Sequence, residues 1–268
     1  DTVGRTPNPD IMCNQEVKFK LFLQTALSSG ADMIATGHYA VVAKSKQFSS
    51  QTELRMANNL VKDQTYFLYR VKQSALAKSL MPIGQFASKD EVRQAARERS
   101  LDTAEKKDSQ GICFVGKVGI KDFLRQYVQV EPGAIVDTNG VVVGMHDGAI
   151  FYTIGQRHGL NIGGGLPYYV ASKDMTKNIV YVTTNLSDTN LWHDEVKVTS
   201  VHYINDRPTI NQKYQVRLRY RGPLVDCSLL LKDDSLIIKL DEPQRGLAAG
   251  QSAVIYDDSR VVGGGIIA

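Results

Sequence analysis

The stretch EVKFKLFLQTALSSGADMIATGHY, residues 16–39, sets out the fold of the first third of the chain. Its apolar residues recur at helical spacing and form one stripe, made of Phe19, Phe22, Leu23, Ala26 and Leu27. Gly30 follows the stripe, at the position where a helix C-terminus favours glycine. The apolar run Met33–Ala35 then predicts a short strand that leads into the polar segment 36–39. This order predicts an α/β layer with functional loops at the strand ends.

The rest of the chain changes character twice. Ser88–Glu91 is a capping box and predicts a second helix. Apolar runs at 134–136 and 141–143 flank Asp137–Gly140 and predict a hairpin. Short strands and turns then predict an all-β barrel or sandwich, with strands at 196–202, 214–220, 225–231, 235–240 and 253–256. We therefore expect three parts, at residues 1–116, 117–190 and 191–268.

Composition narrows the class of protein. The chain has 268 residues, of which 43% are hydrophobic, and its apolar runs are too short to span a bilayer. It has only three cysteines, widely spaced, which argues against a secreted disulfide scaffold and favours a reducing, cytoplasmic location. A net charge of +4 permits a nucleic-acid partner without requiring one.

Two of the cysteines lie in polar, turn-forming segments. Cys13 ends the run Asn8-Pro9-Asp10-Ile11-Met12-Cys13, and Cys113 lies in Asp108-Ser109-Gln110-Gly111-Ile112-Cys113-Phe114. Thiols in such loops indicate sulfur chemistry, although a free cysteine also packs as a small apolar residue. Both interpretations stay open for Cys13 and Cys113. Cys227 lies in an apolar strand and is interpreted as packing.

The sequence offers no pattern typical of a metal site. No C-x-x-C or H-x-x-x-H spacing occurs among the three cysteines and five histidines, so we expect neither a structural metal nor a thioredoxin-like redox motif. The triplets 163–165 and 263–265 lack the frame of a phosphate loop and are expected to form turns or bulges.

Segment 214–221 alternates apolar and basic residues. Read as a strand, it places Arg217, Arg219 and Arg221 on one face. That face is either a solvated surface or a stripe that contacts a phosphate backbone. Segment 62–67 likewise reads either as a helix start or as a polar recognition site.

Several motifs together resemble the bacterial tRNA-specific 2-thiouridylase family, in the family's order along nearly all of the chain. They are Arg5–Asp10 with Cys13-Asn14, Lys18-Phe19, Ala35–Tyr39, Lys62–Gln64 with Tyr66–Leu68, Asp108–Phe114, Tyr152–Arg157, Arg219-Tyr220 and Gly250-Gln251. The resemblance implies a PP-loop ATP pyrophosphatase-type α/β layer, a small central domain and a C-terminal β-barrel. The family's S-G-G-x-D-S phosphate loop is missing from this sequence. We therefore expect most of an enzyme rather than a complete one, with weak ATP binding.

The resemblance also implies a reaction. ATP, with Mg²⁺, would adenylate the C2 oxygen of the wobble uridine of tRNA, and AMP would leave when sulfur attacks that carbon. A cysteine desulfurase or a persulfide relay protein would load the sulfur onto Cys113. Cys13 would be the nucleophile or resolving thiol that closes a disulfide with Cys113, and an external reductant would reset the pair. Asp10 would be the general acid or base.

The family's binding residues carry over to matching positions. Asn8, Pro9 and Asp10 would contact the target base, and Gly37 would contact ATP. The positions implied to contact tRNA are His38, Lys62, Asp63, Gln64, Arg219, Tyr220 and Gln251. Two other interpretations remain: a non-catalytic tRNA-binding protein with incidental cysteines, and another PP-loop adenylating enzyme such as an amide-forming ligase. The ligase is disfavoured because it needs no cysteine pair.

Overall fold

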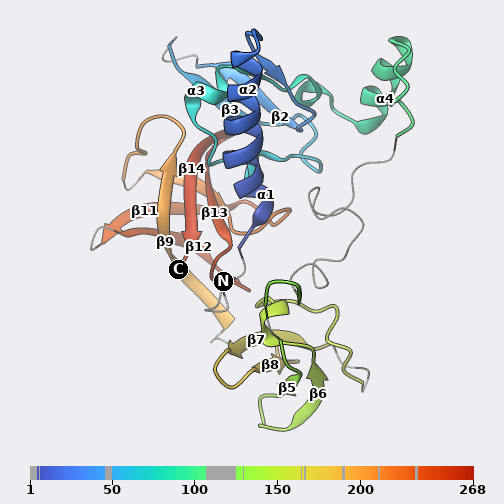
Figure 1. Ribbon diagram of the computed structural model, residues 1–268. Helices are drawn as coiled ribbons and strands as arrows, with labels where there is room; N and C mark the ends of the chain where they lie inside the picture. The colour runs from blue at the N-terminus through green and yellow to red at the C-terminus, as the bar shows by residue number, and fades with distance from the viewer. Residues whose placement is uncertain are drawn as a thin grey trace.

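The computed structural model describes residues 5, 7–45, 50–106, 125–128, 130–163, 165, 167–188, 191–210, 212–232 and 235–268. Three parts follow one another along the chain (Figure 1). A helical first part lies beside a C-terminal barrel, and a small sheet domain lies at the other end of that barrel. None of the described helices has the length and apolar content that a bilayer crossing requires.

One helical rod from Pro9 to Ser28 dominates the first part. It consists of α1 (Pro9–Met12), the π-helix η1 (Cys13–Phe22) and α2 (Leu23–Ser28). A π-helix closes its hydrogen bonds over five residues, which widens each turn. The buried residues Asn14 and Phe19 are accordingly five positions apart. The predicted stripe is therefore only partly correct.

Within that stripe, Phe19 and Leu23 are buried, whereas Phe22 is 54% and Leu27 36% exposed. The rod ends as predicted at Gly30, which has φ +92°. The amide of Gly30 donates to the carbonyl of Leu27, and the amide of Ala31 to that of Ala26, which is the Schellman pattern.

After the rod, β1 (Ile34–Ala35) pairs in parallel with β4 (Ser79–Leu80). Short helices lie between and after these strands: η2 (Thr65–Phe67), α3 (Gln73–Leu76) and η3 (Pro82–Gln85). The predicted second helix is α4 (Lys89–Glu98). Ser88 Oγ accepts from the amide of Glu91, as expected of the box, whereas Glu91 Oε2 accepts from the amide of Ala87, one residue before the N-cap.

A hairpin joins the first part to the barrel. Strands β2 (Ala40–Lys44) and β3 (Thr52–Met56) pair with each other, and β3 pairs with β14 through Arg55 and Arg260. One apolar core crosses the same boundary, since Tyr66 and Leu68 pack with Val254 and Tyr256. The first part and the barrel therefore share both a sheet edge and a core.

The central sheet has the order β6-β5-β8-β7. Its strands are β5 (Gly133–Val136), β6 (Val142–His146), β7 (Tyr169–Asp174) and β8 (Ile179–Thr183), with η4 (Ala149–Phe151) between β6 and β7. The predicted hairpin at Asp137–Gly140 is confirmed. Asp137 Oδ1 accepts from the amides of Asn139 and Val141, and Gly140 has φ +80°.

Six strands close the C-terminal barrel. They are β9 (Trp192–Tyr203), β10 (Lys213–Arg217), β11 (Val225–Lys232), β12 (Ser235–Arg245), β13 (Ser252–Asp257) and β14 (Arg260–Ile267). Pairing of β13 with β14 closes the ring β13-β10-β11-β12-β9-β14. The expected fold class, an α/β part followed by a central domain and a β-barrel, is confirmed. The triplet 263–265 lies within β14 at an irregular register, as expected of a bulge.

Candidate active site and RNA interface

The N-terminus of the helical rod holds three of the predicted site residues. Asn8 caps α1, because its Oδ1 accepts from the amides of Asp10 at 3.2 Å and Ile11 at 3.4 Å. Cys13 follows Asp10 by three positions, and its amide donates to the carbonyls of Asp10 and Pro9. Residues three apart lie on the same side of a helix, so the half-buried Asp10 and Cys13 side chains are neighbours.

Burial changes the chemistry of Asp10. Desolvation raises the pKa of its carboxyl above the ordinary value, and the charge of Lys18 opposes that rise. A carboxyl with a raised pKa stays protonated to a higher pH than an exposed one, which favours a part in proton transfer. The direction of this shift is compatible with the acid–base role that the family resemblance implies for Asp10, and that role stays a prediction.

Asn14 ties the rod to the segment that follows Lys62–Gln64. Its side chain is 3% exposed, and its Nδ2 donates to the carbonyl of Phe67 at 3.2 Å. Phe19, one wide turn later, lies against the His38 ring at a centroid distance of 5.6 Å. The rod that carries Cys13 is thereby fixed against two segments that the sequence singled out.

His38 is a buried, neutral imidazole. It is 8% exposed, and burial, helped by the charge of Lys18, lowers its pKa to about 4. Its Nδ1 lies 3.0 Å from Thr36 Oγ1. Gly37, beside it, is exposed, and within the described residues no atom other than those of its chain neighbours is found within 4 Å of the position that a Cβ would take. The backbone at Gly37 is therefore accessible to a ligand.

The Lys62–Gln64 segment is held by its own side chains. Gln64 Oε1 accepts from the amide of Tyr39 at 3.0 Å, and the Gln64 amide donates to the Tyr39 carbonyl at 2.9 Å. Asp63 is 2% exposed and accepts from Thr65 Oγ1 and the Ala57 amide at 2.6 and 2.9 Å. Only Lys62 and Gln64 keep partial exposure, so Asp63 faces the protein interior.

The prediction of a basic stripe along residues 214–221 is wrong for its first member, Arg217. Arg217 is 8% exposed, its Nη1 donates to Asp63 Oδ1 at 3.2 Å, and its guanidinium lies 5.4 Å from the centroid of the Tyr256 ring. Strand β10 also ends at Arg217, and Arg221 has φ +59° in the turn that follows. The alternation therefore stops before Arg219, which is exposed together with Arg221.

Tyr220 connects the barrel to the first part. Its ring lies 4.2 Å from that of Phe67 and 6.2 Å from that of Tyr66, measured between centroids. The Arg221 guanidinium covers the Tyr220 ring at 5.2 Å. The structure thus brings the motif around Lys62 and the motif Arg219-Tyr220 together across the boundary between the first part and the barrel.

The three cysteines differ in what can be described. Cys113, with the whole motif Asp108–Phe114, lies outside the described residues. Cys227 is fully buried in the barrel, and desolvation raises the pKa of its thiol to about 12, which suits the packing role expected of it.

Gln251 directly precedes β13, and its amide donates to the carbonyl of Ala248. Among the described residues, no group of three or more His, Cys, Asp and Glu could hold a metal ion.

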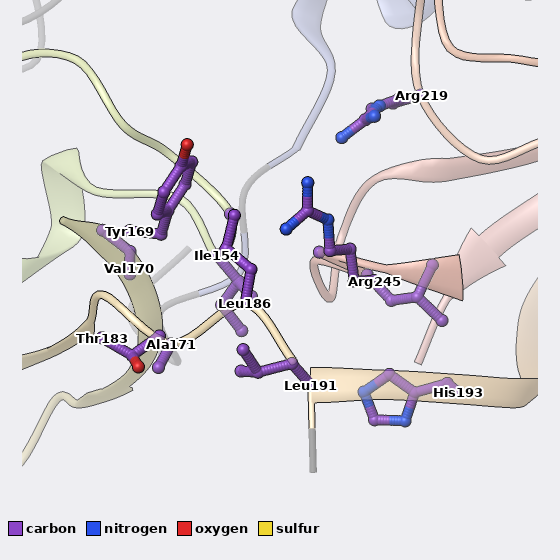
Figure 2. Close-up of a pocket in the computed structure, with 13 residues that line it drawn as sticks. Ile154, Tyr169, Val170, Ala171, Thr183, Leu186, Leu191, His193, Arg219 and Arg245 are labelled. Atoms are coloured by element: carbon purple, nitrogen blue, oxygen red, sulfur yellow. The ribbon is translucent and has the colours of Figure 1, made fainter. Parts of the chain in front are cut away.

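Arg245, at the end of β12, was not among the site residues predicted from the sequence. Its guanidinium lies 6.0 Å from the centroid of the Tyr169 ring and 5.7 Å from that of Trp192. It shares a cavity of about 180 Å³ with Arg219 (Figure 2). No local pattern marks Arg245, because the closure of the barrel brings it to Arg219 and the packing of the central sheet on the barrel brings it to Tyr169.

Comparisons with known proteins cover nearly the whole chain. Residues 2–117 match the family described as tRNA methyl transferase HUP domain, residues 121–184 its PRC-barrel domain, and residues 193–267 an aminomethyltransferase β-barrel domain. A tRNA-specific 2-thiouridylase of Bacillus cytotoxicus is 43% identical over 98% of this chain and 71% of its own length. Those of Streptococcus sanguinis and Hydrogenovibrio crunogenus are each 42% identical over 98% of this chain and over 72% and 71% of their own lengths.

Proposed function

The chain belongs to the tRNA-specific 2-thiouridylase family, and we propose how its residues carry out that family's reaction. It is a sulfurtransferase that acts on tRNA, and its HUP domain places it among the enzymes that use ATP. We propose that the modified atom is C2 of the wobble uridine, that Mg²⁺ accompanies ATP, and that the enzyme is cytoplasmic. One observation carries the catalytic proposal: Asp10, with its raised pKa, and Cys13 are neighbours at the start of one helix.

The reaction needs two thiols. Adenylation of the C2 oxygen forms a bond from that oxygen to the α-phosphorus of ATP and releases pyrophosphate. A persulfide on Cys113, loaded by a cysteine desulfurase or a relay protein, delivers its terminal sulfur to C2, and AMP leaves. The transferred sulfur is then bonded to both C2 and Cys113, and the Cys13 thiolate attacks the Cys113 sulfur, which breaks that S–S bond, releases the thiolated base and forms a Cys13–Cys113 disulfide. A two-electron external reductant returns both cysteines to thiols. Asp10 moves the proton that must leave or return at the base.

The target base would bind at the N-terminal cap of the rod. Asn8 already uses Oδ1 to cap α1, so its Nδ2 is the group that remains for a base. Pro9 at the first helical position fixes the backbone beside it. Gly37, with open space around it, would receive part of ATP.

Contacts to tRNA are proposed for residues on both sides of the boundary between the first part and the barrel. Lys62 and Gln64 lie on one side, and Arg219 and Tyr220 lie on the other. Gln251 directly precedes β13 of the barrel. Asp63 is assigned an indirect role, because its carboxylate holds Arg217 and the amide of Ala57 rather than facing solvent. His38, buried and neutral, would act as a hydrogen-bonding group and not as a cation.

A second activity follows from the description of the matched family, which speaks of methyl transfer. Methyl transfer needs no pair of thiols, and the two activities give different products. The test incubates the full-length enzyme with tRNA, ATP and a persulfide donor, and analyses the nucleosides by mass spectrometry. We expect 2-thiouridine and one AMP for each sulfur transferred. A methylated uridine with no thiouridine, or tRNA bound with no modification, would overturn the proposal.

A further inference from the structure

Two arginines, Arg219 and Arg245, line the cavity at the seam between the central sheet and the barrel. Among the residues that the structure describes, none accepts a hydrogen bond from the guanidinium of Arg219 or Arg245, and no carboxylate lines the cavity. Figure 2 shows the two groups pointing toward one another, across from Tyr169 and Ile154. Two like charges brought together without a counter-ion repel each other, so the arrangement favours an anion between them.

The seam is built by close backbone packing. Gly155 and Gly246 both have positive φ, of +83° and +71°, and a Cβ on Gly155 would lie 3.2 Å from the Cα of Gly246. The loop of Gly155 is fixed to β7, since its amide donates to the carbonyl of Val170 at 2.8 Å. The motif Tyr152–Arg157, to which no catalytic step assigns a role, therefore holds the central sheet against the end of β12 that carries Arg245.

Arg245 is held in place before any ligand arrives. Tyr169 of the central sheet and Trp192 of the barrel flank its guanidinium at 6.0 and 5.7 Å. Such cation–π contacts orient the guanidinium and leave its N–H groups for an acceptor. A planar, oriented guanidinium is the side chain best suited to bind phosphate oxygens.

The size of the cavity limits the ligand. Its volume is about 180 Å³. That space accepts a phosphate group with part of its ribose against the apolar wall of Ile154 and Leu191, and it does not accept a duplex.

We propose that this seam binds one backbone phosphate of the tRNA, held between Arg219 and Arg245. The proposal rests on the tRNA substrate of the proposed function. It adds Arg245 as an RNA-binding residue. It also implies that the motif Tyr152–Arg157 acts by packing the central sheet against the end of β12. Binding across the seam also makes the position of the central sheet on the barrel part of tRNA recognition.

The test measures tRNA affinity of the full-length enzyme at several salt concentrations. Each phosphate contact that is lost lowers the slope of log affinity against log salt by about one unit. We expect that loss in Arg245→Gln, whereas Arg245→Lys keeps its charge and the wild-type slope. Lys239→Gln is the matched control, because Lys239 is exposed earlier on the same strand and does not line the cavity. Its slope should equal that of the wild type.

The proposal is overturned if Arg245→Gln keeps the wild-type slope, or if Lys239→Gln lowers it equally. A free anion is tested separately by thermal unfolding with inorganic phosphate, against chloride at equal ionic strength. If phosphate raises the Tm of the wild type but not of Arg245→Gln, while the tRNA slopes agree, the seam binds a small anion instead. Salt slopes do not depend on turnover, so failure to form 2-thiouridine would reject the proposed function and leave this result unaffected.

Discussion

Arg217 and Asp63 form an ion pair, with Nη1 3.2 Å from Oδ1, that joins the barrel to the first part of the chain. Their side chains are 10% and 0% exposed, so both charges are largely removed from bulk water. A buried charge that loses its partner costs far more than an exposed one. The pair therefore fixes how the Lys62–Gln64 segment sits beside Arg219 and Tyr220.

We expect Arg217→Met to lower the free energy of unfolding by about 3–5 kcal/mol, because it leaves the Asp63 carboxylate buried and unpaired. The double variant with Asp63→Asn should lose less than the sum of the single variants. Lys213→Gln is the control on the same strand. Its partner Asp241 is 39% exposed, and the loss should stay below about 1 kcal/mol. Urea unfolding measures the four variants and the wild type, and equal losses for Arg217→Met and Lys213→Gln would contradict the assignment.

Asn8 has two assigned tasks that one substitution separates. Asn8→Ala removes the cap of α1 and should cost about 0.5–2 kcal/mol of stability. Asn8→Asp keeps an oxygen that can accept from the amides of Asp10 and Ile11, so its stability should stay close to that of the wild type. If Asn8 also donates to the base, Asn8→Asp still loses thiolation. Full activity in Asn8→Asp would restrict Asn8 to capping.

His38 gives the fold a defined dependence on pH. Its pKa is about 4 in the folded protein, against about 6.5 in an unfolded chain. Between these values the unfolded state binds the extra proton, so stability falls as pH falls from about 6.5 to 4 and is fully present above that range. The total contribution is about 3 kcal/mol, since one pKa unit corresponds to about 1.4 kcal/mol.

His38→Gln should therefore flatten the pH dependence of unfolding below about pH 6.5 by as much as about 1.4 kcal/mol per pH unit. Glutamine can still hydrogen-bond to Thr36 but does not titrate. The measurement is urea unfolding at several pH values, with His158→Gln as the control because His158 is exposed. Parallel curves for wild type and His38→Gln would show that His38 is not the group responsible.

Local rules predicted the features that depend on neighbouring residues. Gly30 ends the rod, Ser88 caps α4 and Asp137 folds its hairpin, because each needs only partners within five positions. Phe22 belongs to the predicted apolar stripe but is exposed, because the π-helical turns before it shift the register of the helix. No periodic pattern indicates that widening.

Long-range partners account for the other differences. Arg217 reads as exposed in an alternating strand, yet it is buried by Asp63, a residue 154 positions earlier. Arg245 and Tyr169 meet only because β12 and β7 come together at the seam. The sequence contains all these residues, but it does not say which carboxylate or ring each arginine will meet.

The roles of the two loop cysteines give the decisive chemical test. Cys113→Ser should lose sulfur loading from the donor, measured as radiolabelled sulfur on the full-length protein. Cys13→Ser should still load and then fail to thiolate tRNA, because nothing takes up the Cys113 sulfur. Asp10→Asn should load normally and slow the later step by a factor of roughly 10²–10⁴. Cys227→Ala is the control, since burial keeps that thiol protonated and it should load and thiolate as the wild type does. Loss of loading in Cys13→Ser with loading kept in Cys113→Ser would reverse the two roles, and normal thiolation in both would exclude the cysteine mechanism.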